Sequence, residues 1–270
     1  MTSSYTIRPS AVAGMFYPGD PQTLLDDLRG YINAAPQGNA RPLAAISPHA
    51  GWHYSGHVAG AVFASIEVPN RVILIGPNHR GRGAALALDP HDAWEFPFGE
   101  VPVDRELGAL LLQYCPQLKE DSAAHAQEHS LEVIVPFLHA KNPAVKIAPV
   151  CVGTHDAHKL AALAAAVARA ARETGALVVA STDMTHYLSD KTARAIDGKM
   201  IETLTSLDPE KILAAALGEQ ALCGAGPVYV TVSAARENGA RNFEVIRYAT
   251  SGDIEGNRDA VVGYGGFVIS

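Results

Sequence analysis

The segment Arg71–Gly83, RVILIGPNHRGRG, decides the fold, because an apolar run ends abruptly in a turn that carries a histidine. After its first residue, the part Arg71–Gly76 is apolar at every position, which is typical of a strand covered on both faces of its sheet. Two other runs have the same form: Leu43–Ser47 is followed by PHAGW, and Ala176–Ser181 is followed by TDMTHY. In open α/β sheets, ligands bind beyond the carboxyl ends of the strands. The three turns therefore predict a site at that edge.

The remainder of the chain alternates between strand and helix patterns. Further strands are expected at Ala84–Leu88, Lys146–Val152, Glu244–Thr250 and Ala260–Ile269. Helices are expected at Pro21–Ile32, His57–Ile66, Asp104–Gln113, Ser130–His139, Asp156–Glu173, Lys191–Ser206, Pro209–Leu217 and Pro227–Asn238. This alternation predicts one α/β domain over residues 1–270, a three-layer α/β/α sandwich with a mainly parallel or mixed central sheet.

Composition narrows the class of protein. With 48% hydrophobic residues in 270, the chain has ample material for a core, yet no apolar run reaches the roughly 20 residues of a membrane span. The net charge is −7 and no basic stripe is present, which argues against nucleic acid as a partner. No secretory signal is recognisable, and three widely spaced cysteines make no disulfide framework. We expect a cytoplasmic protein that binds neither membrane nor nucleic acid.

His49 and His79 are the first candidates for metal ligands. Both follow predicted strands in turns shaped by proline, glycine or asparagine. Neutral imidazole is the commonest metal ligand in proteins, and two imidazoles plus one anionic group, with open positions, are the set used by non-haem iron oxygenases. Spacing leaves the third ligand open between Asp183, on a strand-end turn, and Cys223, in the glycine-rich turn Ala221–Pro227. A thiol at the start of a helix is biased towards the thiolate form that binds metals.

Two further histidines are candidates for proton transfer. His186 follows the third strand, where Asp183 is expected to orient it, and His129 directly precedes the helix that Ser130 would cap. The positive end of that helix should keep His129 neutral. The other histidines and cysteines discussed are assigned structural, solvated or inert positions: His53 and His57, which are placed largely in a loop, and His125, His155, His158, Cys115 and Cys151.

These motifs, read in order, resemble the Memo family, whose bacterial and archaeal members are called AmmeMemoRadiSam system protein B. The resemblance covers about residues 7 to 269 and rests on Ala13–Pro18 (AGMFYP), Ser47–Gly51 (SPHAG), Gly76–His79 (GPNH), Glu128–Glu132 (EHSLE) with Pro136-Phe137, Ser181–Tyr187 (STDMTHY) and Cys223-Gly224. It implies a fold like the catalytic subunit of class III extradiol dioxygenases, which are non-haem Fe(II) enzymes.

The resemblance also implies site residues. His49, His79 and Cys223 would surround one metal ion, and Asp183, His186 and His129 would line the same pocket. Fe(II) is the expected ion, with copper or zinc as alternatives. In the dioxygenases the third ligand is a glutamate, whereas Cys223 matches that position here, and a thiolate is softer and favours copper(I) or zinc more than a carboxylate does.

Four functions are compatible with these residues. The first is a dioxygenase-like oxidoreductase that acts with O₂ on a small organic substrate. The second is a non-catalytic copper- or iron-binding redox protein. The third is a signalling or scaffold module whose pocket receives a peptide or a partner protein of a radical-SAM system. The fourth is a zinc hydrolase, since two histidines and a cysteine form a known catalytic zinc set.

Overall fold

The central feature is a mixed sheet. A computed structural model describes residues 5–270, and within them nine strands form this sheet in the order β10-β12-β2-β9-β3-β8-β4-β7, with β11 paired to β12. A small second sheet has the order β1-β5-β6. The strands are β1 (Ile7–Arg8), β2 (Ala44–Ser47), β3 (Arg71–Pro77), β4 (Leu86–Leu88), β5 (Ala93–Phe96), β6 (Gly99–Pro102), β7 (Lys119–Glu120), β8 (Lys146–Val152), β9 (Leu177–Ser181), β10 (His186–Leu188), β11 (Phe243–Thr250) and β12 (Val261–Ile269).

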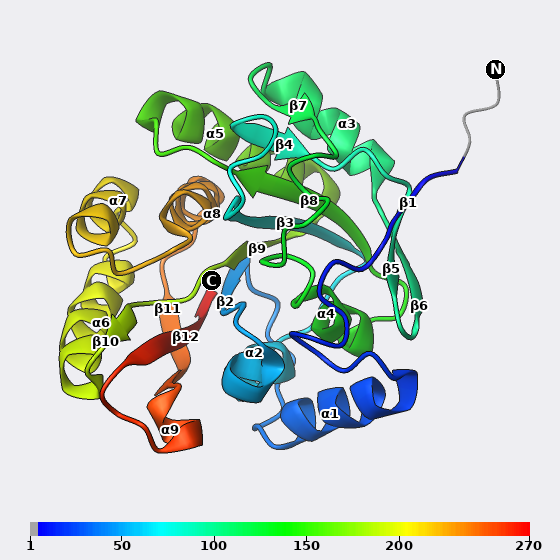
Figure 1. Cartoon of the computed structure of the whole chain (residues 1–270). Coiled ribbons are helices and arrows are strands. Elements are labelled where there is room, and N and C mark those ends of the chain that lie inside the picture. Colours follow the sequence, from blue (N-terminus) through cyan, green and yellow to red (C-terminus); the bar gives the residue numbers. More distant parts are fainter. Residues whose placement is uncertain (1–4) are drawn as a thin grey trace.

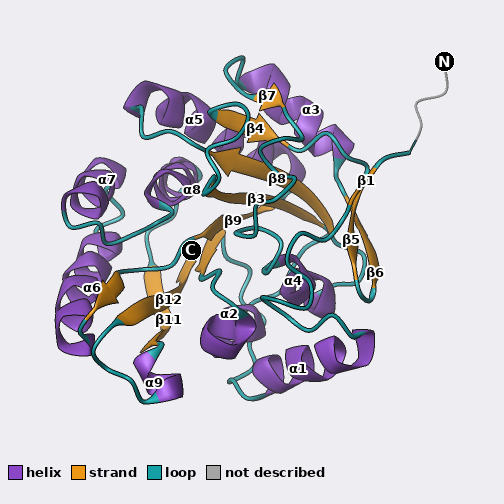
Figure 2. Ribbon diagram, in the orientation of Figure 1, coloured by secondary structure: helices purple, strands orange, loops and turns teal. Residues whose placement is uncertain are grey.

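Helices cover both faces of the main sheet, as Figures 1 and 2 show. Helices α1, α2 and α4 lie on one side, and α5, α7 and α8 on the other (Figure 1). The helices are α1 (Pro21–Asn33), α2 (Trp52–Ser65), α3 (Arg105–Tyr114), α4 (Val135–Lys141), α5 (Ala157–Thr174), α6 (Asp190–Thr205), α7 (Pro209–Gly218), α8 (Ala225–Glu237) and α9 (Gly252–Glu255). The expected three-layer α/β/α sandwich is confirmed.

Strand β3 shows why the sheet must be covered twice. Ile73 and Ile75 pack in one hydrophobic cluster with α5 and α8, whereas Val72 and Leu74 pack in the other with α1, α2 and α4. All four side chains are fully buried. Because successive side chains of a strand point to opposite faces, an apolar run without alternation is stable only between two helical layers.

The four inner strands are parallel and in register. Strand β2 pairs with β9, β9 with β3, and β3 with β8, with Ser47 opposite Ser181 and Pro77 opposite Val152. Their carboxyl ends therefore meet at one edge of the sheet, and the loops that follow them converge there. This arrangement places the predicted site.

Several local predictions are wrong, and each has a physical reason. Helix α2 begins at Trp52 rather than near His57, because Gly51 serves as its N-cap and Gly56 is accommodated inside it against the ring of Tyr31. A Cβ at Gly56 would approach that ring to 2.8 Å. His53 and His57 therefore lie on a helix and not in a loop.

No helix among the described residues is long and apolar enough to cross a membrane.

The helix expected over Ser130–His139 is also shorter than predicted. Helix α4 begins only at Val135, and residues 130–134 form turns. The Ser130 hydroxyl donates to the carbonyl of Pro77 (3.0 Å), and the Ser130 N–H donates to Glu128 (3.0 Å). Ser130 therefore fastens this loop to β3 instead of capping a helix.

Candidate metal centre

The loops at the carboxyl edge of the inner strands enclose a cleft of about 960 Å³. The loop after β2 supplies His49, the loop after β3 supplies His79, and the loop after β9 supplies Asp183. All six residues singled out in the sequence line this cleft: His49, His79, His129, Asp183, His186 and Cys223. The structure therefore brings together the residues that strand-end placement singled out in the sequence.

Three of these residues form a group of possible metal ligands. The donor atoms of His49, His79 and Cys223 lie within 4.8 Å of one another. The Cys223 Sγ is 3.3 Å from His49 Nε2, and the ring centroids of the two histidines are 5.0 Å apart. Two nitrogens and one sulfur thus converge, and three protein ligands of these types are the set of a metal site that keeps one position open.

The tautomer of His49 is fixed by a relay of hydrogen bonds. Its Nδ1 lies 2.7 Å from the Ser181 hydroxyl, and that hydroxyl donates its only proton to the carbonyl of Ser130 (2.6 Å). Ser181 can therefore only accept from His49, so Nδ1 carries the proton and Nε2 presents a lone pair towards Cys223. His49 is buried, and this burial, helped by the positive charge that His79 can carry, holds its pKa well below the ordinary value. The ring is thus neutral, as a metal ligand must be.

His79 is oriented by Glu128. One carboxylate oxygen, Oε1, lies 2.9 Å from His79 Nδ1, and the other, Oε2, accepts the His79 backbone N–H at 2.7 Å. Burial acts to raise the pKa of Glu128, but the hydrogen bond and charge of His79 and the N–H of Ser130 hold it at about 2. The ionised carboxylate accepts the Nδ1 proton, which leaves His79 Nε2 free. A carboxylate behind an imidazole is the usual support of a metal-bound histidine.

A second group of possible ligands, His79, Glu128 and His129, shares these atoms. Glu128 is already saturated, because Oε1 also accepts the backbone N–H groups of His129 and Ser130, each at 3.0 Å. A metal ion bound by Glu128 would displace these contacts. We therefore assign Glu128 to the support of His79 rather than to a metal ion.

Cys223 lies in the turn before α8. Its Sγ accepts the backbone N–H of Asp183 at 3.2 Å. Gly224 follows without a side chain because a Cβ there would collide with the carbonyl oxygen of Ser181 and approach Thr182 Cβ to 2.7 Å. Desolvation raises the pKa of the Cys223 thiol to about 12, and the charge of Asp183 adds to this. The expected bias of the free thiol towards thiolate is wrong, since desolvation outweighs the nearby helix start.

Asp183 lies at the margin of the cluster. Its Oδ1 accepts the backbone N–H groups of His49 (2.7 Å) and Ala50 (3.3 Å), and its Oδ2 is 3.9 Å from His49 Nε2. Burial raises its pKa to about 7. These contacts fix the loop that carries His49. We expected Asp183 to orient His186, but its side-chain hydrogen bonds go to the backbone of His49 and Ala50 instead.

His129 and His186 both line the cleft. The His129 ring stacks on His79 at 4.7 Å and contacts Phe16 at 4.7 Å, and its buried Nδ1 has no hydrogen-bond partner among the described residues. Burial lowers the pKa of His129 to about 4 and also lowers that of His186. His129 is neutral as predicted, but because of burial and not because of a helix end.

Sequence reasoning missed the residues that support the site. Glu128 and Ser181 were read only as parts of motifs, although their neighbours His79 and His49 are held by them. Arg80 and His155 also line the cleft, and His155 was expected to be merely solvated. His155 follows β8, the fourth inner parallel strand. Because ligands bind beyond the carboxyl ends of parallel strands, the position of His155 after β8 could have identified it from the sequence.

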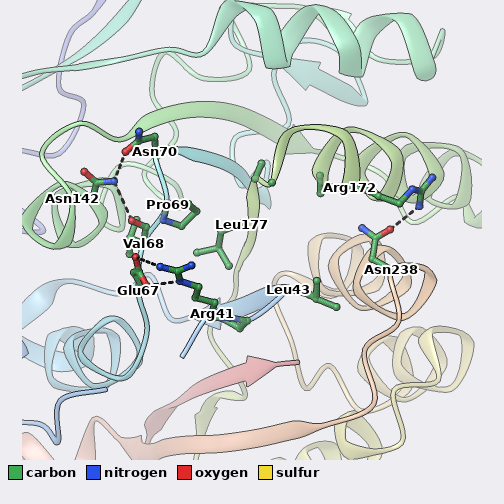
Figure 3. Close-up of a pocket in the computed structure, with 14 residues that line it drawn as sticks. Arg41, Leu43, Glu67, Val68, Pro69, Asn70, Asn142, Arg172, Leu177 and Asn238 are labelled. Atoms are coloured by element: carbon green, nitrogen blue, oxygen red, sulfur yellow. Dashed lines mark hydrogen bonds and ion pairs between the residues drawn. The ribbon is translucent and has the colours of Figure 1, made fainter. Parts of the chain in front are cut away.

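A second cavity, of about 600 Å³, lies at the opposite edge of the sheet and contains none of these residues. Figure 3 shows that its polar side chains bind one another: Arg41 pairs with Glu67, Asn142 with Asn70, and Arg172 with Asn238. It lacks the grouped histidines of the first cleft. The grouped histidines therefore lie at the carboxyl edge of the sheet.

Fold and cluster together define an α/β/α protein with a candidate two-histidine, one-cysteine metal site. Residues 8–268 match the family model described as Memo-like protein. The chain is 39% identical to a MEMO1 family protein of Archaeoglobus fulgidus over 267 residues, which cover 97% of this chain and 99% of the relative. It is 37% identical to one of Aquifex aeolicus over 268 residues, which cover 97% and 98% of the two chains. The chain belongs to the Memo family, as its motifs indicated.

Proposed function

We propose that this protein binds one metal ion through His49 Nε2, His79 Nε2 and Cys223 Sγ, and acts as an oxidoreductase on a small organic molecule together with O₂. The observation that carries the proposal is the pair of fixed tautomers. Ser181 and Glu128 each accept a hydrogen bond from the Nδ1–H of one histidine, so both Nε2 atoms are left with lone pairs in the group that contains Cys223.

The donor set fits a metal ion. Burial keeps the His49 imidazole neutral, His79 is oriented by Glu128, and the sulfur completes a group of three possible ligands. Fe(II) is the ion we propose, because two imidazoles and one anionic group are the ligands of non-haem iron oxygenases. Copper and zinc are the alternatives, favoured by the sulfur. When bound, an iron or copper ion would supply a Lewis acid and one-electron chemistry.

The other residues of the cleft would bind and position the substrate. His129 and His186 are kept neutral by burial, and each would accept a proton from a substrate hydroxyl in the cleft. Asp183 holds the His49 loop through two backbone N–H groups. Phe16 packs against the His129 ring and lines the same cleft.

The sulfur supports a second candidate, a non-catalytic metal binder. Cys223 takes the place that a glutamate has in the dioxygenases which the fold resembles, and a soft ligand favours copper(I) storage or transfer over oxygen chemistry. The cleft would then receive a peptide or a partner protein, including a protein of a radical-SAM system, instead of a small substrate.

Metal analysis tests the proposal first. We expect wild-type protein loaded anaerobically with Fe(II) to retain one equivalent after desalting, and His49→Ala and Cys223→Ala to lose it. His53→Ala is the matched control, since His53 is exposed on α2 outside the cleft. Oxygen uptake with catechols and related phenols then separates the two candidates. Retention of the metal by His49→Ala would overturn the site, whereas tight metal binding without oxygen uptake favours the binder.

A further inference from the structure

Tyr187 stands out of the sheet at the mouth of the cleft. In the pairing of β10 with β12, His186 lies opposite Val262 and Leu188 opposite Val261, so Tyr187 is an extra residue without a partner. Its φ is +60°, a left-handed conformation that few residues other than glycine and asparagine adopt readily. A bulge of this kind re-aims a side chain, and bulges are frequent beside active sites.

The strain at Tyr187 is held in place by its neighbours. The backbone N–H of Thr185 donates to buried Asp197 at 3.1 Å, and that of Met184 donates to the carbonyl of Gly263 at 2.8 Å. The Tyr187 ring gains no burial in return, because the residue is 78% exposed. A strained backbone that presents an exposed aromatic ring is explained by contact with something outside the chain.

The surroundings of Tyr187 indicate what that contact is. Its ring lies edge-on to His186, with centroids 5.7 Å apart, and both residues line the metal cleft. Leu217, at the end of α7, lines the same cleft and is 42% exposed. Ile196 and Leu222 add further apolar surface. The cleft thus has a polar wall of histidines and an apolar wall that extends to its mouth.

We propose, on the basis of the metal site proposed above, that Tyr187 is a ligand-contacting residue which selects molecules with a planar, apolar end. The polar head of such a molecule binds at His49, His79 and Cys223. Its planar end leaves the cleft against the ring of Tyr187. Offset or edge-to-face contact between two rings strengthens binding beyond simple burial.

Calorimetric titration of the Zn(II)-loaded protein with three hydroxamates tests this inference. Acetohydroxamate has only the metal-binding head, benzohydroxamate adds a planar ring, and cyclohexanecarbohydroxamate adds an apolar ring that is not planar. We expect Tyr187→Gly to bind benzohydroxamate about two- to tenfold more weakly and acetohydroxamate as the wild type does. Tyr187→Phe should retain wild-type affinity for both. Tyr5→Gly is the matched control, since Tyr5 is 64% exposed and does not line the cleft.

The thermal midpoint separates this role from a structural one. Glycine adopts positive φ without strain, so we expect Tyr187→Gly to unfold at or above the wild-type temperature while it loses ring selectivity. Equal changes for acetohydroxamate and benzohydroxamate, or no change for either, would overturn the role of Tyr187 and leave the metal site standing. Failure of the wild type to bind acetohydroxamate would overturn the metal site and this inference with it.

Discussion

Replacing Glu128 by glutamine keeps the shape of the side chain and removes one acceptor. Oε1 accepts from His79 Nδ1 and from the backbone N–H groups of His129 and Ser130, and Oε2 accepts the backbone N–H of His79. A glutamine oxygen can serve only one of these two sets. Its NH₂ group, a donor, must then face N–H groups at the other set.

The expected loss follows from these contacts. Hydrogen bonds to charged groups contribute about 1.5–3 kcal/mol, and each 1.4 kcal/mol is roughly tenfold in an equilibrium constant. Removing the carboxylate behind a metal-binding histidine typically weakens metal binding about 10- to 100-fold. We therefore expect Glu128→Gln to bind Zn(II) about 10- to 100-fold more weakly, measured by calorimetric titration at pH 7 in competition with a chelator of known affinity.

Glu132→Gln is the matched control. Glu132 is also fully buried, on the same loop, but it accepts hydrogen bonds from Arg8, Tyr17 and the backbone N–H groups of Ala11 and Val12 and contacts none of the proposed ligands. The Glu132→Gln variant should have a lower free energy of unfolding, but its folded form should bind zinc as tightly as the wild type does. The reasoning is refuted if Glu128→Gln binds zinc within twofold of the wild type, or if both variants weaken binding equally.

Three more predictions concern stability and the site. Arg8→Met should lower the free energy of unfolding by about 3–5 kcal/mol in urea titrations, because it leaves a buried carboxylate without its cation; no change would show that the pair is dispensable. Gly224→Ala should destabilise the chain by about 1–3 kcal/mol and weaken zinc binding, since the new Cβ collides with the backbone of Ser181; wild-type values for both would contradict this. The hydrogen bond from Arg194 lowers the pKa of Asp190 to about 2, so its stabilising contribution is complete above about pH 4 and is lost as the pH falls towards 2. Asp190→Asn should flatten urea stability measured across that range, and an unchanged slope would refute the assignment.

The sheet and the edge where the candidate ligands gather could be predicted from the sequence because each follows from a local pattern. Continuous apolar runs such as that of β3 require cover on both faces, and parallel strands bring their carboxyl ends together. His49 and His79 were singled out as candidate ligands in this way. Cys223 was only one of two choices, because the turn before α8 reaches the cluster through a contact between residues 40 apart in sequence, Asp183 N–H to Cys223 Sγ.

What the sequence did not reveal depends on distant contacts. Glu128 shows no periodicity that marks it as the partner of His79, 49 residues away. The sequence after Glu128 predicts a helix. The Ser130 hydroxyl instead donates a hydrogen bond to the carbonyl of Pro77 in β3, and this tertiary contact overrides the local helix propensity. Strands β5 and β6 were not predicted, because short strands in a small separate sheet carry too few residues for a pattern.

An anomalous-difference map of crystals grown without added metal and then soaked in Fe(II) tests the central claim most directly. It identifies both the position and the element of a bound ion. The account predicts one peak among His49 Nε2, His79 Nε2 and Cys223 Sγ, with Glu128 and Ser181 still bound to the opposite ring nitrogens. A peak at Glu128 and His129 would contradict it, and so would the absence of any peak in the cleft after a soak in excess Fe(II).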